Sequence, residues 1–291
     1  MTGGHSLINL GDISKPATVL IERISDAIGG YFQPYQIRRI AKAEADAAKI
    51  EASAQIEVSE LQRRALQRFL VEEARRQDNM EAITAKALPN VTEGADPAKV
   101  EDDWIANFFD KCRLISDDEM QNLWALVLAG EANAPGAYSK RTVDFLASLD
   151  KSDAELFTTL CRFAWQSDRS LPLIYDTNDP IYLDAGITFA NLSHLDDIGL
   201  LRFQSVAGFQ LRRQPRRIVL TYFDSLITLE FPKDEDNHVE IGQVYLSNVG
   251  RQLAPICNTT PVLAYLDYVL ARWAAAGIVC SSPLRLQRAS T

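Results

Sequence analysis

Cysteine and histidine are scarce in this sequence of 291 residues, with four of the first and three of the second. No two cysteines form a C-x-x-C pair, so neither a zinc knuckle nor a dithiol redox motif is encoded. The glycine-rich phosphate loops, the H-E-x-x-H zinc motif and the G-x-S-x-G nucleophile motif are also missing. These absences argue against a nucleotide hydrolase, a dehydrogenase, a metalloprotease and a serine hydrolase. We therefore expect no catalytic residue, no cofactor and no metal, although a nonstandard enzyme stays open.

Long hydrophobic runs and an excess of positive charge are lacking as well. The longest uninterrupted apolar run covers residues 123–129, whereas about 20 residues are needed to span a bilayer. The formal net charge of −9 disfavours a protein whose main partner is nucleic acid or an anionic membrane. The N-terminus does not read as a secretory signal peptide, and the scattered cysteines are typical of reduced thiols. We therefore predict a cytoplasmic protein.

Residues 1–35 are predicted to hold a leader and one short amphipathic helix. Within residues 16–32, one helical stripe carries the apolar side chains of Val19, Leu20, Ile24, Ala27 and Ile28. Ser14 or Pro16 supplies the start of the helix, and Gly29 supplies its end. Such a helix docks on a protein core, lies on a membrane surface or closes an oligomer. Its polar face is not rich in Lys and Arg, which disfavours the membrane.

Residues 36–88 are the most distinctive stretch, because they lack glycine and proline and are rich in the strongest helix formers. They predict one long helix, of about 75 Å if it is unbroken. The second half has the wider apolar face, formed by Leu61, Leu66, Phe69, Leu70 and Met80. A small domain cannot bury such a helix along its full length, so we predict that it pairs copies of the chain. A solvated single helix held by ion pairs is the alternative.

Residues 89–99 contain two prolines and a glycine and are predicted to form a linker. Residues 100–167 follow, rich in aromatic side chains and punctuated by helix-start signals such as the Ser116 and Glu119 pair and Ser139. They predict four short helices that form an all-α domain, with Trp124 in its core.

One polar cluster in this domain is a candidate anion site. It consists of Ser139, Arg141 and Thr142, which open a helix shortly after Glu131 and a Pro-Gly turn. Helix N-termini bind anions through their free N–H groups. A simple turn and cap is the commoner explanation of such a pattern.

Residues 168–291 change character toward short strands. Helix, turn, β-ribbon and a short helix that begins at Ser247 follow one another, which is the order of a winged-helix-like module, and residues 260–277 form a closing helix. The predicted fold class is thus mainly α with a small α+β part: a long N-terminal helix, an all-α helical domain and a C-terminal winged-helix-like module.

The densest basic run outside the long helix surrounds Pro215. It consists of Arg212, Arg213, Arg216 and Arg217. On a wing these side chains would reach a phosphate backbone. However, the preceding helix carries Asp196 and Asp197, where a reader of the major groove would carry Arg, Lys, Asn or Gln. We therefore predict a surface for a protein partner, with simple surface ion pairing and DNA binding as the alternatives.

Four segments together resemble a known family. They read GGYFQPYQIRRIAKAEADA, EEARRQDNMEAI, DDWIANFFDKCRLISDDEMQNLWALVLAGE and PGAYSKRTVDFL. Between residues 29 and 165, nearly half of the chain, the sequence is similar to the bacterial DUF2806 family, a domain of unknown function. The resemblance implies no activity, cofactor or catalytic residue. The family's recurrence in bacterial and phage-related genomes suggests, by association only, a role in phage defence or another mobile-element function.

These features favour a nonenzymatic, oligomeric interaction or scaffold protein of bacteria or their phages. Its expected partners are a second copy of itself and an unidentified protein. A DNA-associated winged-helix regulator is the first alternative. A membrane-active defence effector that uses residues 16–32 is the second.

Overall fold

The computed structural model describes residues 14–28 and 60–282, which belong to two compact units divided between Ser148 and Leu149. The described part of the first unit is built from α1 (Lys15–Ala27), α3 (Glu60–Ala87), η2 (Leu88–Asn90), η3 (Pro97–Lys99), α4 (Asp102–Cys112), α5 (Asp118–Asn133) and α6 (Lys140–Ala147). Residues 60–87 of the predicted long helix are helical, as α3. Residues 36–59 of that prediction, and residues 1–13 of the predicted leader, lie outside the described residues.

Helix α1 is docked on the first unit through its apolar face. The Ser14 hydroxyl caps the helix by accepting a hydrogen bond from its first turn, so the predicted start is confirmed. Leu20 and Ile24 are fully buried, and the helix packs against η3 and α4. Arg23 adds an ion pair of 2.7 Å with Asp102 at the start of α4. The centre of the predicted apolar stripe is therefore buried in the first unit, whereas Val19, Ala27 and Ile28 are half-buried.

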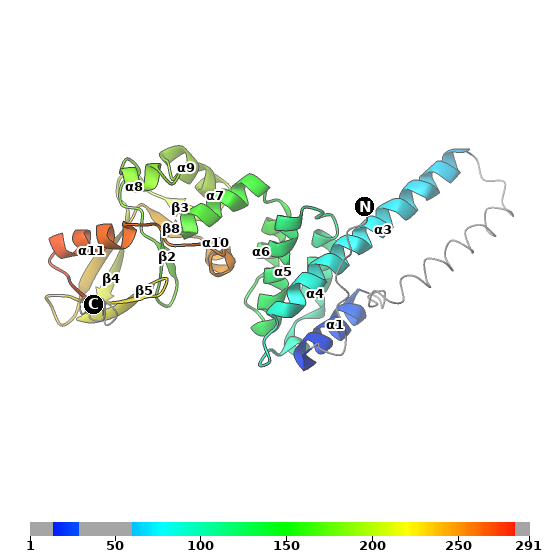
Figure 1. The fold of residues 1–291 in the computed structure, drawn as a ribbon, viewed down its shortest axis with the longest axis horizontal. Coiled ribbons are helices and arrows are strands. Elements are labelled where there is room, and N and C mark those ends of the chain that lie inside the picture. Colours follow the sequence, from blue (N-terminus) through cyan, green and yellow to red (C-terminus); the bar gives the residue numbers. More distant parts are fainter. Residues whose placement is uncertain (1–13, 29–59, 283–291) are drawn as a thin grey trace, which may run out of the picture. The chain divides into compact units, whose positions relative to one another are not determined.

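The core of the first unit is aromatic. Trp124 of α5 is fully buried and meets Phe108 of α4 edge-on, with ring centroids 5.1 Å apart. Trp104 stacks on the same Phe108 ring. The last turns of α3 pack along α5 and bury Ile83 and Ala87. The first turns of α3 extend past these neighbours (Figure 1).

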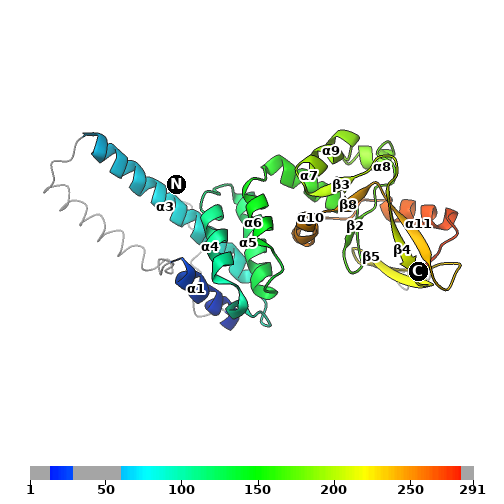
Figure 2. The same cartoon turned by 180° about the vertical axis from the view of Figure 1, so that it is seen from behind.

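The second unit alternates helices with short strands. Its helices are α7 (Lys151–Cys161), α8 (Pro180–Leu183), α9 (Phe189–Asp197), α10 (Asn248–Leu253), η4 (Ala254–Ile256) and α11 (Tyr265–Ala275). Its strands are β1 (Ala164–Gln166), β2 (Ser170–Pro172), β3 (Leu201–Phe203), β4 (Phe209–Gln214), β5 (Arg217–Tyr222), β6 (Ser225–Glu230), β7 (Asn237–Gly242), β8 (Val244–Leu246) and β9 (Val279–Ser281). Helices α8 and α9 lie side by side (Figure 1 and Figure 2), and α9 packs on β3.

The strands of the second unit overturn the predicted fold class. Among the described residues they form an antiparallel sheet in the order β2-β1-β5-β6-β9 and two strand pairs, β3-β8 and β4-β7. The prediction of a mainly α chain with a small α+β part is therefore wrong, because the fold is mixed α+β. Several of these strands have three residues, too few for an alternating pattern to stand out in the sequence.

The arrangement around residues 209–222 differs from the predicted wing. Strand β4 pairs with β7, while β5 pairs with β6. The β4 register shifts between Leu211 and Gln214, Arg213 has a φ of 57°, and Pro215 cannot donate to a ladder. These three features turn the chain between two different strand pairs. Helix α7, which the sequence places in the all-α domain of residues 100–167, belongs to the second unit.

At Gly242 the backbone passes very close to the segment that contains Ile174. Gly242 has a φ of 88°, and a Cβ atom there would lie 2.1 Å from the carbonyl oxygen of Ile174. The next residue, Gln243, donates its backbone N–H to the same oxygen at 2.6 Å. No side chain fits at this position without moving the two segments apart.

Trp124 provides a test of the first unit's core. Trp124→Ala should lower the free energy of unfolding by about 3–5 kcal/mol, because it opens a cavity among packed rings. Trp124→Phe should cost less than half of that, since the indole N–H has no hydrogen-bond partner to lose within the described residues. Urea unfolding of both variants measures this. Equal costs, or an Ala cost below about 1 kcal/mol, would contradict the buried placement.

Candidate functional site

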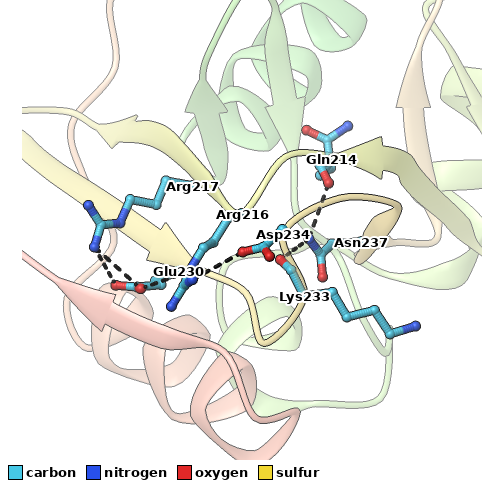
Figure 3. Close-up of polar contacts among 7 residues, drawn as sticks. All are labelled: Gln214, Arg216, Arg217, Glu230, Lys233, Asp234 and Asn237. Carbon is cyan, nitrogen blue, oxygen red and sulfur yellow. Dashed lines mark hydrogen bonds and ion pairs between the residues drawn. The ribbon is translucent and has the colours of Figure 1, made fainter.

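Two of the four predicted arginines are held by acidic side chains. Arg216 contacts Glu230 Oε1 through Nε at 3.2 Å and Asp234 Oδ1 through Nη1 at 3.0 Å. Arg217 reaches Glu230 from the neighbouring strand at 3.2 Å, because the two residues are direct partners in the β5-β6 register. Figure 3 shows Glu230 between the two guanidinium groups. These arginines are therefore largely neutralised.

Arg212 and Arg213 differ from them. Both lie on β4 and are exposed. Within the described ranges 14–28 and 60–282, none of the ion pairs involves either of them. The predicted quartet thus splits into a paired half and an unpaired half. The unpaired half retains two exposed positive charges.

Hydrogen bonds to backbone carbonyl groups hold the loop between β6 and β7 in place. Asn237 is buried, and its Nδ2 donates to the carbonyl oxygens of Lys233 at 2.8 Å and Gln214 at 3.2 Å. The backbone N–H of Arg216 donates to the Asp234 carbonyl at 2.9 Å. This network, drawn in Figure 3, ties the loop to the end of β4. Side-chain and backbone hydrogen bonds therefore connect this loop to the arginine segment.

A pocket of about 200 Å³ lies beside this loop. Its wall comes from three separate stretches of chain: Tyr175, the loop with β7, and α11 with the turn after it. Polar and charged groups on the wall include Tyr175, Lys233, His238, Glu240, Arg272 and Trp273. Tyr175 and Trp273 are 7% and 3% exposed, and burial raises the pKa of the Tyr175 hydroxyl. Sequence reasoning missed this pocket, because residues so far apart show no spacing that would connect them.

The candidate anion site at Ser139, Arg141 and Thr142 is occupied by the protein's own groups. Ser139 is the N-cap of α6, as predicted, and its Oγ accepts from the Thr142 N–H at 3.2 Å. Thr142 is fully buried, whereas Arg141 is exposed. The Ser139 and Thr142 hydroxyl oxygens lie 3.1 Å apart. The cluster behaves as a cap.

Glu131 is the acid that organises the turn before α6. It is 3% exposed, and its two oxygens accept from the backbone N–H groups of Gly136 at 2.6 Å and Tyr138 at 2.8 Å. Burial raises the pKa of Glu131, and these two N–H donors oppose that rise. The buried carboxylate thus provides acceptors for two backbone N–H groups of the turn before α6. The Gly-Glu and Pro-Gly pairs in the sequence indicate a turn here. They do not indicate that the Glu131 carboxylate binds backbone N–H groups of that turn.

The other acidic clusters also have structural roles. His194 contacts Asp153 of α7 at 2.8 Å rather than its neighbours in sequence. Asp196 accepts a hydrogen bond from the Phe203 backbone N–H at 3.0 Å and so ties α9 to β3. In the part of the chain that the structure describes, no group of three or more His, Cys, Asp or Glu side chains is placed to hold a metal ion.

The length and hydrophobicity of the described helices bear on a membrane-spanning role. In residues 14–28 and 60–282, none is long and apolar enough to cross one. Leu20 and Ile24, at the centre of the apolar face of α1, are buried where this helix packs on the first unit.

The comparisons with known proteins give one match. The model of a family described as "Protein of unknown function (DUF2806)" matches residues 63–270. No curated protein and no solved structure matches the chain. The match reaches from the exposed part of α3 through the arginine segment to α11, so it includes both units.

Glu131 provides a test of the occupied turn. Glu131→Gln should lower the free energy of unfolding by about 1–3 kcal/mol, because an amide NH₂ replaces one of the two accepting oxygens. Urea unfolding measures the change. Glu93→Gln, at an exposed position of the same unit, is the matched control and should be neutral. A neutral result for Glu131→Gln would mean that the two N–H groups have other partners.

The arginine segment is tested with duplex DNA. We expect no submicromolar binding at physiological salt, since two of the four arginines are paired and the chain carries a net charge of −9. Fluorescence anisotropy at several salt concentrations measures this. Arg212→Ala with Arg213→Ala, compared with Arg216→Ala with Arg217→Ala, locates any contact. Tight, salt-sensitive binding whose log-salt slope falls by about two units in the first variant would favour the DNA alternative.

Proposed function

We propose that this chain, which belongs to the DUF2806 family of proteins of unknown function, is a nonenzymatic scaffold that pairs with a second copy of itself. The observation that carries the proposal is the exposed first half of α3. All residues from Glu60 to Val71 are exposed, whereas the last turns of the same helix are buried against α5. One helix thus has an anchored half and a half that no other described residue covers.

The exposed half of α3 carries an apolar stripe. Leu66, Phe69 and Leu70 stand at positions i, i+3 and i+4 and are 54%, 57% and 39% exposed. Leu61, near the start of the described helix, is 70% exposed but lies on another part of the helix surface. Large apolar side chains gathered on one helical face, rather than scattered, are typical of an interaction surface. The stripe ends at Glu72 and Glu73.

The charges beside the stripe fit a second, antiparallel copy. Arg64, Arg68 and Glu72 follow one another at spacings of four residues on one flank. A two-fold axis near residue 68 places Arg64 of one copy opposite Glu72 of the other, and Leu66 opposite Leu70. Arg68 contacts Glu72 within the chain at 3.6 Å, but no ion pair among the described residues uses Arg64. The second copy supplies the acid that Arg64 lacks.

The second unit would then present Arg212 and Arg213 to a protein partner. Pairing through α3 doubles each exposed surface, so a weak contact with an acidic partner gains from two simultaneous attachments. We place this assembly in the cytoplasm, in keeping with the sequence prediction. A role in phage defence is part of the proposal only through the distribution of the family.

The proposal is tested by substituting the stripe. At about 50 µM the full chain should be a dimer or larger in light scattering, and Leu66→Glu with Phe69→Glu should shift it toward the monomer, because charges replace the contact. Val71→Glu is the control, since Val71 is 65% exposed but lies on the other side of the helix from Phe69. Deleting the helix is not a clean test, because Ile83 and Ala87 belong to the core. A monomeric parent protein would defeat the proposal.

A charge exchange tests the antiparallel register separately. Arg64→Glu alone and Glu72→Arg alone should each weaken assembly, since like charges then face each other. An equal mixture of the two variants should recover part of it as a heterodimer. Assembly that is unaffected by either change would retain the pairing but reject this register.

A further inference from the structure

Two cysteines that are far apart in the sequence lie in contact in the second unit. Cys161 is the last residue of α7, and Cys257 is the first residue after η4. Their thiols are joined by a hydrogen bond, and neither is in a disulfide. The other two cysteines lie elsewhere, Cys112 in α4 of the first unit and Cys280 in β9. The fold thus pairs two thiols that no spacing in the sequence connects.

Three further hydrogen bonds hold the chain around the two thiols in place. Arg162, the residue after the first cysteine, donates from Nε to the carbonyl oxygen of Thr260 at 3.2 Å. The Tyr222 hydroxyl donates to the Arg162 carbonyl oxygen at 2.8 Å and accepts from the Val262 N–H at 2.9 Å. The end of α7 is therefore attached to residues 257–264, which lead from η4 to α11 and contain no helix or strand. These contacts keep the two thiols close to each other.

The two thiols differ in how readily they lose a proton. Cys257 is half-buried, whereas Cys161 is 5% exposed. In the reduced pair Cys257 donates to the Leu253 carbonyl oxygen at 3.6 Å, which leaves its sulfur to accept the S–H of Cys161. That hydrogen bond lowers the pKa of Cys257, burial opposes this, and the Thr158 hydroxyl adds to the lowering. The same hydrogen bond, together with burial, raises the pKa of Cys161.

This difference sets the order in which the two thiols react. The thiolate, not the thiol, is the nucleophile of cysteine. Cys257 is the more accessible of the two and the first to lose its proton, so it attacks first. Cys161 keeps its proton and stands beside the sulfur that has reacted. An accessible thiolate next to a second, resolving cysteine is the arrangement that oxidants convert to a disulfide.

We propose that Cys161 and Cys257 form a reversible disulfide, with a peroxide as the oxidant. The Cys257 thiolate attacks hydrogen peroxide, an S–O bond forms as the O–O bond breaks, and the released hydroxide takes up a proton to become water. The Cys161 sulfur then attacks the sulfenic acid on Cys257. An S–S bond forms as the S–O bond breaks, and the departing hydroxide leaves as a second water with the Cys161 proton. Two thiols are oxidised, and one peroxide is reduced to two waters.

Such a bond would attach the connection between η4 and α11 covalently to α7. The two thiols are reduced in the structure, and disulfides of cytosolic proteins are usually transient and redox-sensing. A bond that peroxide closes and cellular thiols open again is therefore a modification site rather than a permanent crosslink. It acts within one chain, because both sulfurs belong to the same unit.

Peptide mapping by mass spectrometry tests the proposal on the full chain. After a small molar excess of hydrogen peroxide, and alkylation of the remaining thiols with N-ethylmaleimide, the linked peptides should be those of Cys161 and Cys257. Cys112 and Cys280 should be alkylated, and dithiothreitol should restore all four thiols. In denaturing urea the link should form at least about tenfold more slowly, because the ends of a long loop must then meet by chance. No link, a link chiefly to Cys112 or Cys280, or equal rates in both conditions would overturn the proposal.

Single substitutions test the order of the steps. Cys161→Ser keeps a hydrogen-bond donor and should stop at the sulfenic acid of Cys257, which dimedone traps. Cys257→Ser should yield neither the link nor a sulfenic acid, because Cys161 is buried and keeps its proton. Cys280→Ser is the matched control, since Cys280 is also half-buried, and should form the link at the parental rate. Loss of the link in this control, or a sulfenic acid on Cys161 with none on Cys257, would show that the proposal is wrong.

Discussion

The contact between Gly242 and Ile174 is the constraint on which the second unit depends. The Ile174 carbonyl oxygen leaves no room for a Cβ atom at residue 242, and it accepts a hydrogen bond from the backbone N–H of Gln243. At this crossing the chain leaves β7, which pairs with β4, and enters β8, which pairs with β3. The crossing also fixes Tyr175, the residue after Ile174, against α11. A backbone contact without side chains thus sets both the strand order and one wall of the pocket.

Helix α3 combines two requirements that its sequence meets in different halves. Its last turns bury Ile83 and Ala87 against α5, while Lys86 joins Asp118 at the start of that helix by an ion pair of 2.6 Å. Its first turns keep large apolar side chains in solvent. Because a continuous helix transmits its direction along its axis, the buried half determines where the exposed half points. The core of the first unit therefore orients the surface that we assign to pairing.

Features that depend on a few consecutive residues could be predicted from the sequence. The caps at Ser14, Ser139 and Ser247 are present, because a cap needs only a short side chain and the next turn of the helix. The Ser116 and Glu119 pair predicts the start of α5 one residue too early, because the capping residue is Asp117. One carboxylate oxygen of Asp117 accepts from two backbone N–H groups. Neighbouring capping residues compete, and only their geometry in the fold decides between them.

Features that depend on distant residues could not be predicted. The sheet joins Gln166 to Thr221, and the last described strand reaches back to β6, so the pairing rests on contacts that no local pattern encodes. The paired half of the arginine run likewise depends on Glu230, which only the β5-β6 register brings opposite Arg217. The pocket shows this dependence most clearly. Its wall combines the segment beside Gly242, the loop between β6 and β7, and α11.

The position of β9 in the sheet has a consequence for the order of events during synthesis. Strand β9, residues 279–281, forms an edge of the main sheet by pairing with β6. The sheet is therefore incomplete until the ribosome has released almost the whole of this sequence. The described helices of the first unit are complete by Ala147, and domains generally fold as units in the order of synthesis. A nascent chain can thus display the exposed half of α3 on a folded first unit while the second unit is still unfinished, so pairing can begin between neighbouring chains on one messenger RNA.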